Sequence, residues 1–408
     1  MPRRRSVAAW TVYDLANTIF ALGVGSLYFA SWLSDRDVPD IALAAAIDGA
    51  MIVVIVLGPW IGARSDHQGH RVPYLVPTTL LAVAATAFLG AGAVALNLVL
   101  FAIALIGFNL GTVIYDALLP DVSTPENRGR VSGAGVAVGY VGSFIAVGVG
   151  KLLLDSSGYP AVFRTIAVLF LLFAVPTFLF VEESPRAPRR GAPPRLRRAV
   201  GGLIEAWRRA GNDPGVRRFL VARFFYSDAI NTLIGGFLTI FVLEDLEFSD
   251  AEVQNLLGVA IFGAVAGAVI VGRLVDRFGP RRLLHATLWT WMAAIAAGIV
   301  AAITGATWLA WVLGTVGGMA LGATWASDRV YMVRLAPPVR LGELYGLYAT
   351  VGRFATVLGP LVWGLTVTVF GLPRTVAMGV LIGFIAAALV ILRGVEGLRT
   401  HHRLPASR

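Results

Sequence analysis

The chain has 408 residues, of which 57% are hydrophobic and only 14% are charged, and its mean hydropathy is +0.75. This composition excludes an ordinary soluble domain and predicts an integral membrane protein. Cysteine is absent, which excludes disulfides, thiolate metal sites and cysteine nucleophiles. The net charge of +10 leaves nucleic-acid binding open until the positions of the basic residues are considered.

Apolar stretches of about 20 residues recur along the whole chain, each long enough to cross a hydrocarbon core about 30 Å thick as a helix. The first stretch follows three arginines, like a signal peptide, but its length and the polar residues Asp14 and Asn17 indicate a retained helix. We expect twelve spans, at roughly 7–33, 41–63, 72–94, 96–119, 131–154, 160–181, 216–243, 251–274, 282–304, 306–333, 342–370 and 372–393.

The basic residues lie almost entirely on the side of the N-terminus, whereas the opposite loops are acidic, as in 35–40 and 244–252. This asymmetry is the positive-inside pattern, so we predict a multi-pass protein of the plasma (inner) membrane with both termini in the cytoplasm. Anchoring to the anionic membrane surface explains the positive charge more simply than nucleic acid, which stays an alternative for the linker alone.

Residues 182–215 are rich in proline and arginine and separate two groups of six spans. Apolar residues alternate with arginines over 195–210, which predicts an amphipathic helix on the cytoplasmic leaflet. A disordered basic tether is the alternative. The expected organisation is a first half at 1–181, this linker, a second half at 216–393 and a cytoplasmic tail at 394–408.

The two halves repeat one another in two separate sets of residues. In the loop after the second span of each half, Gly62, Asp66, Gly69 and Arg71 recur as Gly272, Asp276, Gly279 and Arg281; in the first span of each half, Asp14, Asn17 and Thr18 recur as Asp228, Asn231 and Thr232. Both sets are displaced by nearly the same number of residues, which indicates duplication of a six-helix unit. Such duplicated halves are typical of transporters with a substrate site near the bilayer midplane.

The loop segments GARSDHQGHR and GRLVDRFGPRR resemble the loop signature of the major facilitator superfamily, Gly-x-x-x-Asp-x-x-Gly-x-Arg. The resemblance implies an all-α integral membrane fold with twelve transmembrane helices in two pseudo-symmetric six-helix halves, and it gives the loops the role of a cytoplasmic latch. Arg128 and Arg130 are the expected partners of Asp66, and Arg340 that of Asp276. A helix cap with positive-inside charge is the alternative reading of these loops.

Within that superfamily, four segments are similar to the autophagy-related vacuolar effluxer family and its bacterial relatives. They are WTVYDLANTIF, LLPDVSTPENRGRVSGAGVAVGYVGS, ARFFYSDAINT and GLYATVGRFATVLGP. The chain departs from the family pattern at Asp116 and at Ser327, Asp328 and Arg329. The resemblance implies amino-acid efflux as the substrate class.

Ionisable residues inside spans are expensive to bury, so each is a candidate for the transport pathway. Asp14, Asn17 and Thr18 share one helix face, as do Asp228, Asn231 and Thr232, and we expect these two faces to meet across the central cavity. The alternative is a structural role in helix packing. Asn109, Thr112 and Asp116 share a face of the fourth span, with helix capping as the alternative for Asp116.

Five further charged residues are ranked by their position in the spans. Arg353 lies deep in the eleventh span and must pair with a carboxylate or bind an anionic group of the substrate. Arg223, Asp328 and Arg329 lie nearer the cytoplasmic face and are expected to form gate ion pairs. Asp48, in the second span, ranks lowest as a site residue.

The five histidines fall near or beyond the cytoplasmic ends of the spans, so none is placed to carry protons across the membrane. If transport is coupled to protons, Asp14 or Asp228 is the expected carrier. If it is coupled to sodium, the same oxygens coordinate the ion. The sequence leaves both coupling ions open.

No nucleophile, metal cluster, cofactor motif or phosphate-binding loop is recognisable, so we expect neither an enzyme nor ATP-driven transport. The prediction is a secondary transporter for a small solute, monomeric and without cofactor or metal. A multidrug or sugar transporter, a channel and a non-transporting sensor are the alternatives.

Overall fold

The computed structural model describes residues 4–124, 127–183, 195–211, 213–336 and 341–395, and within them the side chains of 128–130, 198–200, 203, 206, 276, 341–343 and 345 are not described. The described part is built of helices. In the first half these are α1 (Arg4–Leu22), α2 (Phe29–Ser34), α3 (Asp40–Gln68), α4 (Val72–Ala87), α5 (Val94–Ala117), α6 (Leu119–Val122) and α7 (Arg128–Phe180). In the linker and second half they are α8 (Leu196–Ala210), α9 (Pro214–Thr232), α10 (Leu238–Glu244), α11 (Asp250–Phe278), α12 (Pro280–Thr304), α13 (Trp308–Leu335), α14 (Leu341–Phe354), α15 (Leu358–Gly364) and α16 (Arg374–Arg393).

These helices account for the twelve predicted spans. Ten helical stretches in the described part are long and apolar enough to cross a membrane, and α4 is a shorter apolar helix of 16 residues. The twelfth crossing is contained in α7, a 53-residue stretch that reverses direction at Gly158, where φ is 70° and glycine meets no steric penalty. The predicted fold class is confirmed.

Three of the spans are assembled from two helical pieces. The first span runs from α1 through the π-helical turn Gly23–Tyr28 into α2, and the seventh runs from α9 through a similar turn at Leu233–Phe237 into α10. The eleventh span is interrupted between α14 and α15, at residues 355–357. Such irregular backbone inside a membrane protein is tolerated where it faces protein or a cavity.

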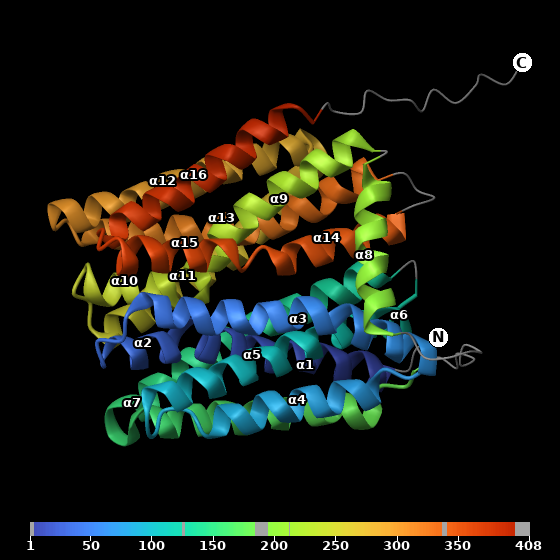
Figure 1. The fold of residues 1–408 in the computed structure, drawn as a ribbon, viewed down its shortest axis with the longest axis horizontal. Helices are drawn as coiled ribbons and strands as arrows, with labels where there is room; N and C mark the ends of the chain where they lie inside the picture. Colours follow the sequence, from blue (N-terminus) through green and yellow to red (C-terminus); the bar gives the residue numbers. More distant parts are fainter. Residues whose placement is uncertain (1–3, 125–126, 184–194, 212, 337–340, 396–408) are drawn as a thin grey trace, which may run out of the picture.

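The helices form two groups that lie side by side (Figure 1). Helices α1 to α7 make one group and α9 to α16 the other, and α8 crosses one end of the molecule and packs on both α3 and α14. The beginning of α1 and the end of α16 lie at the end of the molecule marked by α8, which we call the linker end. We call the other end, where α2 and α10 lie, the opposite end.

Small residues let helices within each group approach closely. A Cβ atom on Gly142 of α7 would lie against the carbonyl oxygen of Leu15 in α1, and one on Gly322 of α13 would overlap the carbonyl oxygen of Ala264 in α11. Because lipid gives helices no hydrophobic reason to associate, this backbone-to-backbone packing is what holds each half together.

Candidate functional site

A cavity of about 190 Å³ lies between the two groups of helices. Its wall is largely apolar and aromatic, with a few polar groups contributed by both halves. The lining residues that the argument uses are Phe20, Phe108 and Asn109 from the first half and Asn231, Thr356 and Pro360 from the second. An apolar pocket with a few converging polar groups between two pseudo-symmetric halves is the form expected of a solute site.

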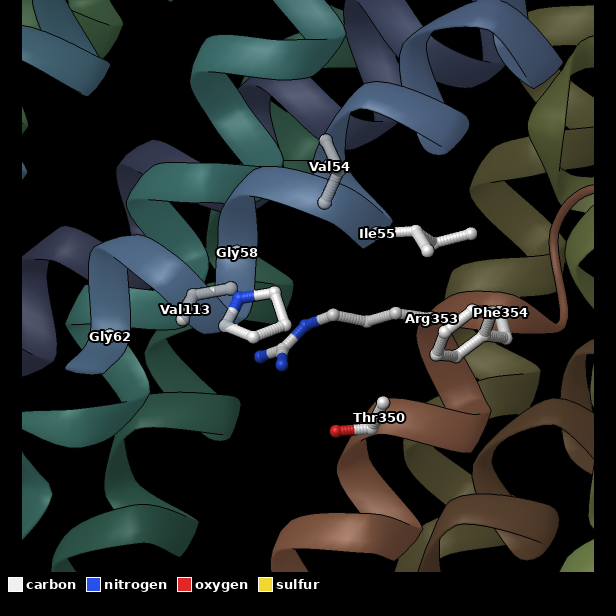
Figure 2. Close-up of a pocket in the computed structure, with 9 residues that line it drawn as sticks. Val54, Ile55, Gly58, Gly62, Val113, Thr350, Arg353 and Phe354 are labelled. Atoms are coloured by element: carbon white, nitrogen blue, oxygen red, sulfur yellow. The ribbon is translucent and has the colours of Figure 1, made fainter. Parts of the chain in front are cut away.

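A second cavity of about 160 Å³ lies nearer the linker end, between α3, α5 and α14. Figure 2 shows Arg353 extending from its own helix toward Gly58 and Val113 of the other half. Its Nη2 atom lies 2.9 Å from Oδ2 of Asp116 on α5. Arg353 thus pairs with a carboxylate here, which is one of the two alternatives that the sequence leaves open for it.

The Arg353–Asp116 pair belongs to a larger cluster of charges between the halves. Asp14 of α1 lies close enough for its carboxylate to interact electrostatically with Asp116 and with the guanidinium of Arg329 on α13. The first half thus supplies two carboxylates and the second half two guanidinium groups. We call Asp14, Asp116, Arg329 and Arg353 the interhalf charge cluster. The side chains of Arg353 and Asp116 are 26% and 57% exposed, so this pair is open to water or solute.

The repeated aspartate motif of the first half faces its own fifth span. A Cβ on Gly135 or Gly139 of α7 would lie 3.3 to 3.4 Å from Oδ2 of Asp14, and one on Gly139 would lie 2.9 Å from the hydroxyl of Thr18. Thr18 donates that hydroxyl to the backbone carbonyl of Asp14, at 2.9 Å. Asn17 is buried, with no partner for its Oδ1 atom.

The copy in the second half faces the interruption of the eleventh span. Asn231 donates its amide to the carbonyl oxygen of Ala355, at 2.7 Å, and so caps the end of α14. Gly359 at the start of α15 packs directly on the hydroxyl of Thr232. Asp228 is completely buried beside this interruption, and both of its carboxylate oxygens lack a hydrogen-bond partner.

The two repeated carboxylates have different surroundings. The charges that act on Asp14 are those of Asp116 and Arg329, whereas Asp228 lies within electrostatic reach of Asp48 on α3. Of the repeated set, Asn231 lines the central cavity. Asp48, which ranked lowest from the sequence, is 8% exposed and also has an unpartnered carboxylate oxygen, Oδ1.

Arg223 and Asp328 form an ion pair that is buried inside the second half. Asp328 is completely buried and also accepts hydrogen bonds from the hydroxyls of Tyr226 and Tyr348, at 3.3 and 3.0 Å. The guanidinium of Arg223 stacks on the ring of Tyr348, with 3.7 Å to the ring centroid. This network joins α9, α13 and α14 of one half, so these two residues do not span the halves here, whereas the neighbouring Arg329 belongs to the interhalf charge cluster.

The first latch loop is held by Arg71. Its guanidinium bonds Asp66 at 2.7 Å, reaches Asp121 at 3.3 Å and also bonds the carbonyl of Ala117 at the end of α5. The carboxylate of Glu183 accepts hydrogen bonds from the backbone N–H groups of residues 71 and 72. The described partner of Asp66 is thus Arg71, a residue of the same loop. Arg71 also fastens this loop to the ends of the fourth and sixth spans.

The second loop is fastened in a comparable way. Arg281 donates from Nη2 to the carbonyl of Arg393 at the end of α16, at 3.1 Å. Gly69 and Gly279 both adopt positive φ, at 79° and 82°, which explains the glycine at this place in each copy. Gly62 lines the cavity of Figure 2, and a Cβ added at Gly272 would meet no described atom within 4 Å. The side chains of Arg128, Arg130 and Asp276, and all of Arg340, lie outside the described residues.

The opposite end is closed by a charge network that the sequence analysis did not identify. Arg374 of α16 binds both carboxylate oxygens of Asp40 in α3, at 2.8 and 2.9 Å, and also reaches Glu244 at 2.8 Å and Asp245 at 3.1 Å. Trp363 donates its indole N–H to Asp40, at 2.7 Å. Burial raises the pKa of the Asp245 carboxyl above its usual range, and Arg374 counteracts that rise. The network joins the halves through Asp40.

Comparison with known proteins identifies the family. The sequence profile described as "Major Facilitator Superfamily" matches residues 13–230, and the one described as "Vacuole effluxer Atg22 like" matches residues 123–401. The chain belongs to the major facilitator superfamily and, within it, to the Atg22-like family.

Among relatives in this superfamily, the chain is 25% identical over 406 residues to an uncharacterised MFS-type transporter, YxiO of Bacillus subtilis, covering 94% of this chain and 93% of that one. It is 26% identical to autophagy-related protein 22-2 of Aspergillus clavatus, covering 62% of this chain but 46% of the fungal protein, so it spans about half of that relative. A crystal structure of the nucleoside transporter NupG, a D323A mutant, superimposes with a TM-score of 0.75 at 12% identity, covering 97% of this chain and all of that one. That likeness shows the fold.

Membership of this superfamily makes the protein a multi-pass membrane protein from a family of transporters. In the part of the chain that the structure describes, no group of three or more His, Asp or Glu residues is arranged to hold a metal ion. The groups around the two cavities offer recognition by charge, hydrogen bonds and aromatic surface.

Proposed function

We propose that this protein is a secondary active transporter that moves a small solute by alternating access, with transport coupled to an ion. The observation that carries the proposal is the interhalf charge cluster, in which two carboxylates of one half face two arginines of the other beside a cavity lined by both. Ion pairs across the interface between the two halves form and break as the halves move. A solute or ion that binds to these charges can therefore favour one conformation over another.

The opposite end is closed by the Arg374 network, which supports a state that is not open on that side. We propose that the linker end is cytoplasmic, because the arginine-rich segments gather there, and that the protein resides in the plasma (inner) membrane as a monomer. The loops held by Arg71 and Arg281 are then proposed to control exchange between states rather than to bind solute.

For the substrate, we propose an amino acid that is exported. A zwitterion carries one carboxylate and one ammonium group, and the cluster offers a partially exposed guanidinium at Arg353 and a partially exposed carboxylate at Asp116. The family description "vacuole effluxer" agrees with efflux. An amphipathic drug-like solute is the second candidate, favoured by the aromatic wall that Phe20, Phe101 and Phe108 give the central cavity.

Uptake of labelled amino acids into proteoliposomes tests the proposal. Arg353→Gln should abolish saturable exchange of the zwitterion, because it removes the charge that meets the carboxylate, while Arg353→Lys should retain part of it at higher KM. Arg164→Gln, an exposed arginine in the sixth span, is the matched control and should behave as wild type.

If the wild-type protein exchanges no amino acid but accumulates amphipathic cations or drugs, the substrate proposal is wrong and the second candidate is supported. If no solute is moved at a saturable rate, transport itself is refuted.

Coupling is tested separately. We propose that Asp14 or Asp228 links ion movement to solute movement, since each is a carboxylate at a matching position in a duplicated helix. The changes Asp14→Asn and Asp228→Asn should preserve exchange down a solute gradient and abolish gradient-driven accumulation in at least one variant. Accumulation at the wild-type level in both variants would make these residues structural.

A further inference from the structure

A cavity of about 430 Å³ lies beneath the linker helix, between α8, α9 and α14. It is larger than the two cavities described above, of about 190 and 160 Å³. Small-molecule sites commonly occupy about 300–1,000 Å³, so this space is large enough for a ligand. Its wall includes Ile204, Trp207, Leu220, Val221, Phe224 and Phe354.

The wall of this cavity is apolar. Its polar side-chain groups are the indole N–H of Trp207 and the hydroxyl of Thr350. That hydroxyl donates to the backbone carbonyl of Gly346, at 2.9 Å, so it is not offered to a ligand. A polar solute in this space would lose hydrogen bonds to water without replacing them, whereas a hydrocarbon chain would gain from burial. The cavity therefore favours an apolar occupant.

The cavity lies at the level of the membrane surface. Figure 1 shows α8 crossing the ends of the long helices at the linker end. Because those helices cross the bilayer, α8 runs along its surface, as amphipathic interfacial helices do. Ile204 and Trp207 are 51% and 39% exposed, so part of the apolar face of α8 is open to the surrounding lipid. A lipid chain can thus enter the cavity from the bilayer itself.

Two arginines lie next to the cavity on the helices that form it. Arg217 precedes Val221 by four residues on α9, and Arg208 follows Ile204 by four residues on α8, so each shares a helix face with a residue of the wall. A Cβ added at Gly211, where α8 ends, would lie 3.6 Å from Nη1 of Arg217. Both arginines are therefore placed near the turn that joins the two helices.

The charges of these arginines are available to a ligand. Arg208 and Arg217 are exposed, and neither guanidinium has an ion pair or hydrogen bond with a residue that the structure describes. A guanidinium group binds phosphate oxygens through paired hydrogen bonds. Arginines at a membrane surface also attract anionic lipid headgroups. Positive charge beside an apolar cavity at this depth matches an amphiphile with an anionic phosphate and a hydrocarbon chain.

We propose that the cavity beneath α8 is a binding site for an anionic phospholipid. Arg208 and Arg217 hold the phosphate, and one acyl chain inserts between α8, α9 and α14. This inference goes beyond the proposed function and does not depend on it. The site also touches the helix of Arg353, because Thr350 and Phe354 line both this cavity and the cavity of Figure 2. A bound chain thus supports α14 from the side facing away from Arg353.

Lipid titration of the purified full chain in detergent tests the headgroup part of the site. Bound phosphatidylglycerol and phosphatidylcholine with identical acyl chains are counted by native mass spectrometry, and the wild type should bind the first phosphatidylglycerol more tightly. The double variant Arg208→Gln/Arg217→Gln should weaken that binding by about 30-fold, about fivefold for each arginine, and leave phosphatidylcholine binding unchanged. The matched control is Arg4→Gln/Arg5→Gln, which removes two exposed arginines at the same end and should bind as wild type.

A second pair of variants tests the chain part of the site. Val221→Trp fills the cavity from its wall and should weaken binding of both lipids, because it excludes the acyl chain. Val269→Trp, at an exposed position of α11, should bind both lipids as the wild type does. Phosphatidylglycerol should raise the melting temperature of the wild type and not that of Val221→Trp, because a ligand stabilises the state that binds it.

Free anions and a second copy of the chain are the competing occupants. Glycerol phosphate, which carries the anionic phosphate without a chain, should not displace phosphatidylglycerol. Displacement by glycerol phosphate would make the arginines a site for a free anion and overturn the proposal. A dimer that Val221→Trp abolishes would assign the cavity to a second copy and overturn it as well.

Two further outcomes decide against the lipid. Equal affinity of the wild type for the two lipids overturns the proposal, and so does unchanged phosphatidylglycerol affinity in either the double arginine variant or Val221→Trp. Lipid binding is measured in detergent without any solute, so its failure leaves the proposed transport standing. A failure to transport any solute would likewise leave the lipid site standing.

Discussion

Removing Arg374 should open the opposite end of the molecule. In the structure this guanidinium binds Asp40 of the other half and two acidic residues of its own half, and Asp40 is only 2% exposed. The change Arg374→Gln leaves Asp40 with the indole of Trp363 as its donor. It also leaves Glu244 and Asp245 beside Asp40 without a counter-charge.

The size of the effect follows from the burial of the pair. Breaking a buried ion pair by removing one partner costs about 3–5 kcal/mol. The side chains of Arg374 and Glu244 are 17% and 32% exposed, so solvent screening reduces the loss. We therefore expect the closed state to lose about 2–3 kcal/mol relative to the open one, a change of about 30- to 150-fold in their ratio.

Labelling of a single cysteine measures this ratio. Ser26 lines the central cavity, and a cysteine there reacts with an impermeant maleimide from the opposite side only when that end opens. Under slow labelling the rate follows the open fraction, so it should rise by about the same 30- to 150-fold factor in Arg374→Gln. Adding Asp40→Asn to this variant removes the uncompensated buried charge and should recover much of the loss.

Arg36→Gln is the control for loss of an arginine at the same end. Arg36 is exposed and stacks on Trp32 of its own half, at 4.2 Å, so its removal should leave the labelling rate unchanged. The reasoning is refuted if Arg374→Gln is labelled at the wild-type rate, or if Arg36→Gln accelerates labelling equally.

Three further predictions concern topology, the latch loop and helix packing. A cysteine at Ser249 should be labelled by an impermeant reagent from outside intact cells and one at Ser184 should not; the reverse pattern would invert the topology. Asp66→Asn should shift the balance of inward and outward states with little change in solute affinity within each state, whereas lost affinity with unchanged accessibility would make the loop a binding element. Gly322→Ala should destabilise the α11–α13 contact by about 1–3 kcal/mol and so lower the melting temperature of the protein. Gly383→Ala, where a Cβ meets no atom within 4 Å, should leave the melting temperature unchanged. Equal melting temperatures for the two variants would contradict the packing argument.

Much of the architecture is predictable because its signals are local. Each span is recognisable from its own hydropathy, and the halves from residues that recur in register. The reversal at Gly158 inside α7 falls in the gap between the spans predicted at 131–154 and 160–181. The interruption at 355–357 is not predicted, because hydropathy gives one continuous eleventh span at 342–370 and the residue that caps the break, Asn231, comes from another span.

The candidate site is predictable only in part. The helical period tells on which face of its helix a side chain lies, but not which residue of another helix it contacts. The shared faces of Asp14 and Asp228 follow from spacing, yet each packs on a span of its own half. Asp48 carries no signal beyond its place inside a span, because the charge that acts on it, that of Asp228, comes from the other half. The pairing of Asp40 with Arg374 joins residues 334 positions apart, and its one sequence signal was an arginine on the acidic side of the membrane.

The interruption between α14 and α15 has a mechanical meaning. A continuous helix transmits a tilt along its whole length, so movement at one membrane surface must appear at the other. Here α14, which carries Arg353 toward the linker end, and α15, which packs on α3 toward the opposite end, are separate rigid rods joined by residues 355–357. In the proposed transport cycle, this break lets the two ends move separately, so that a fully occluded intermediate, shut at both membrane surfaces around its cargo, forms without bending a helix.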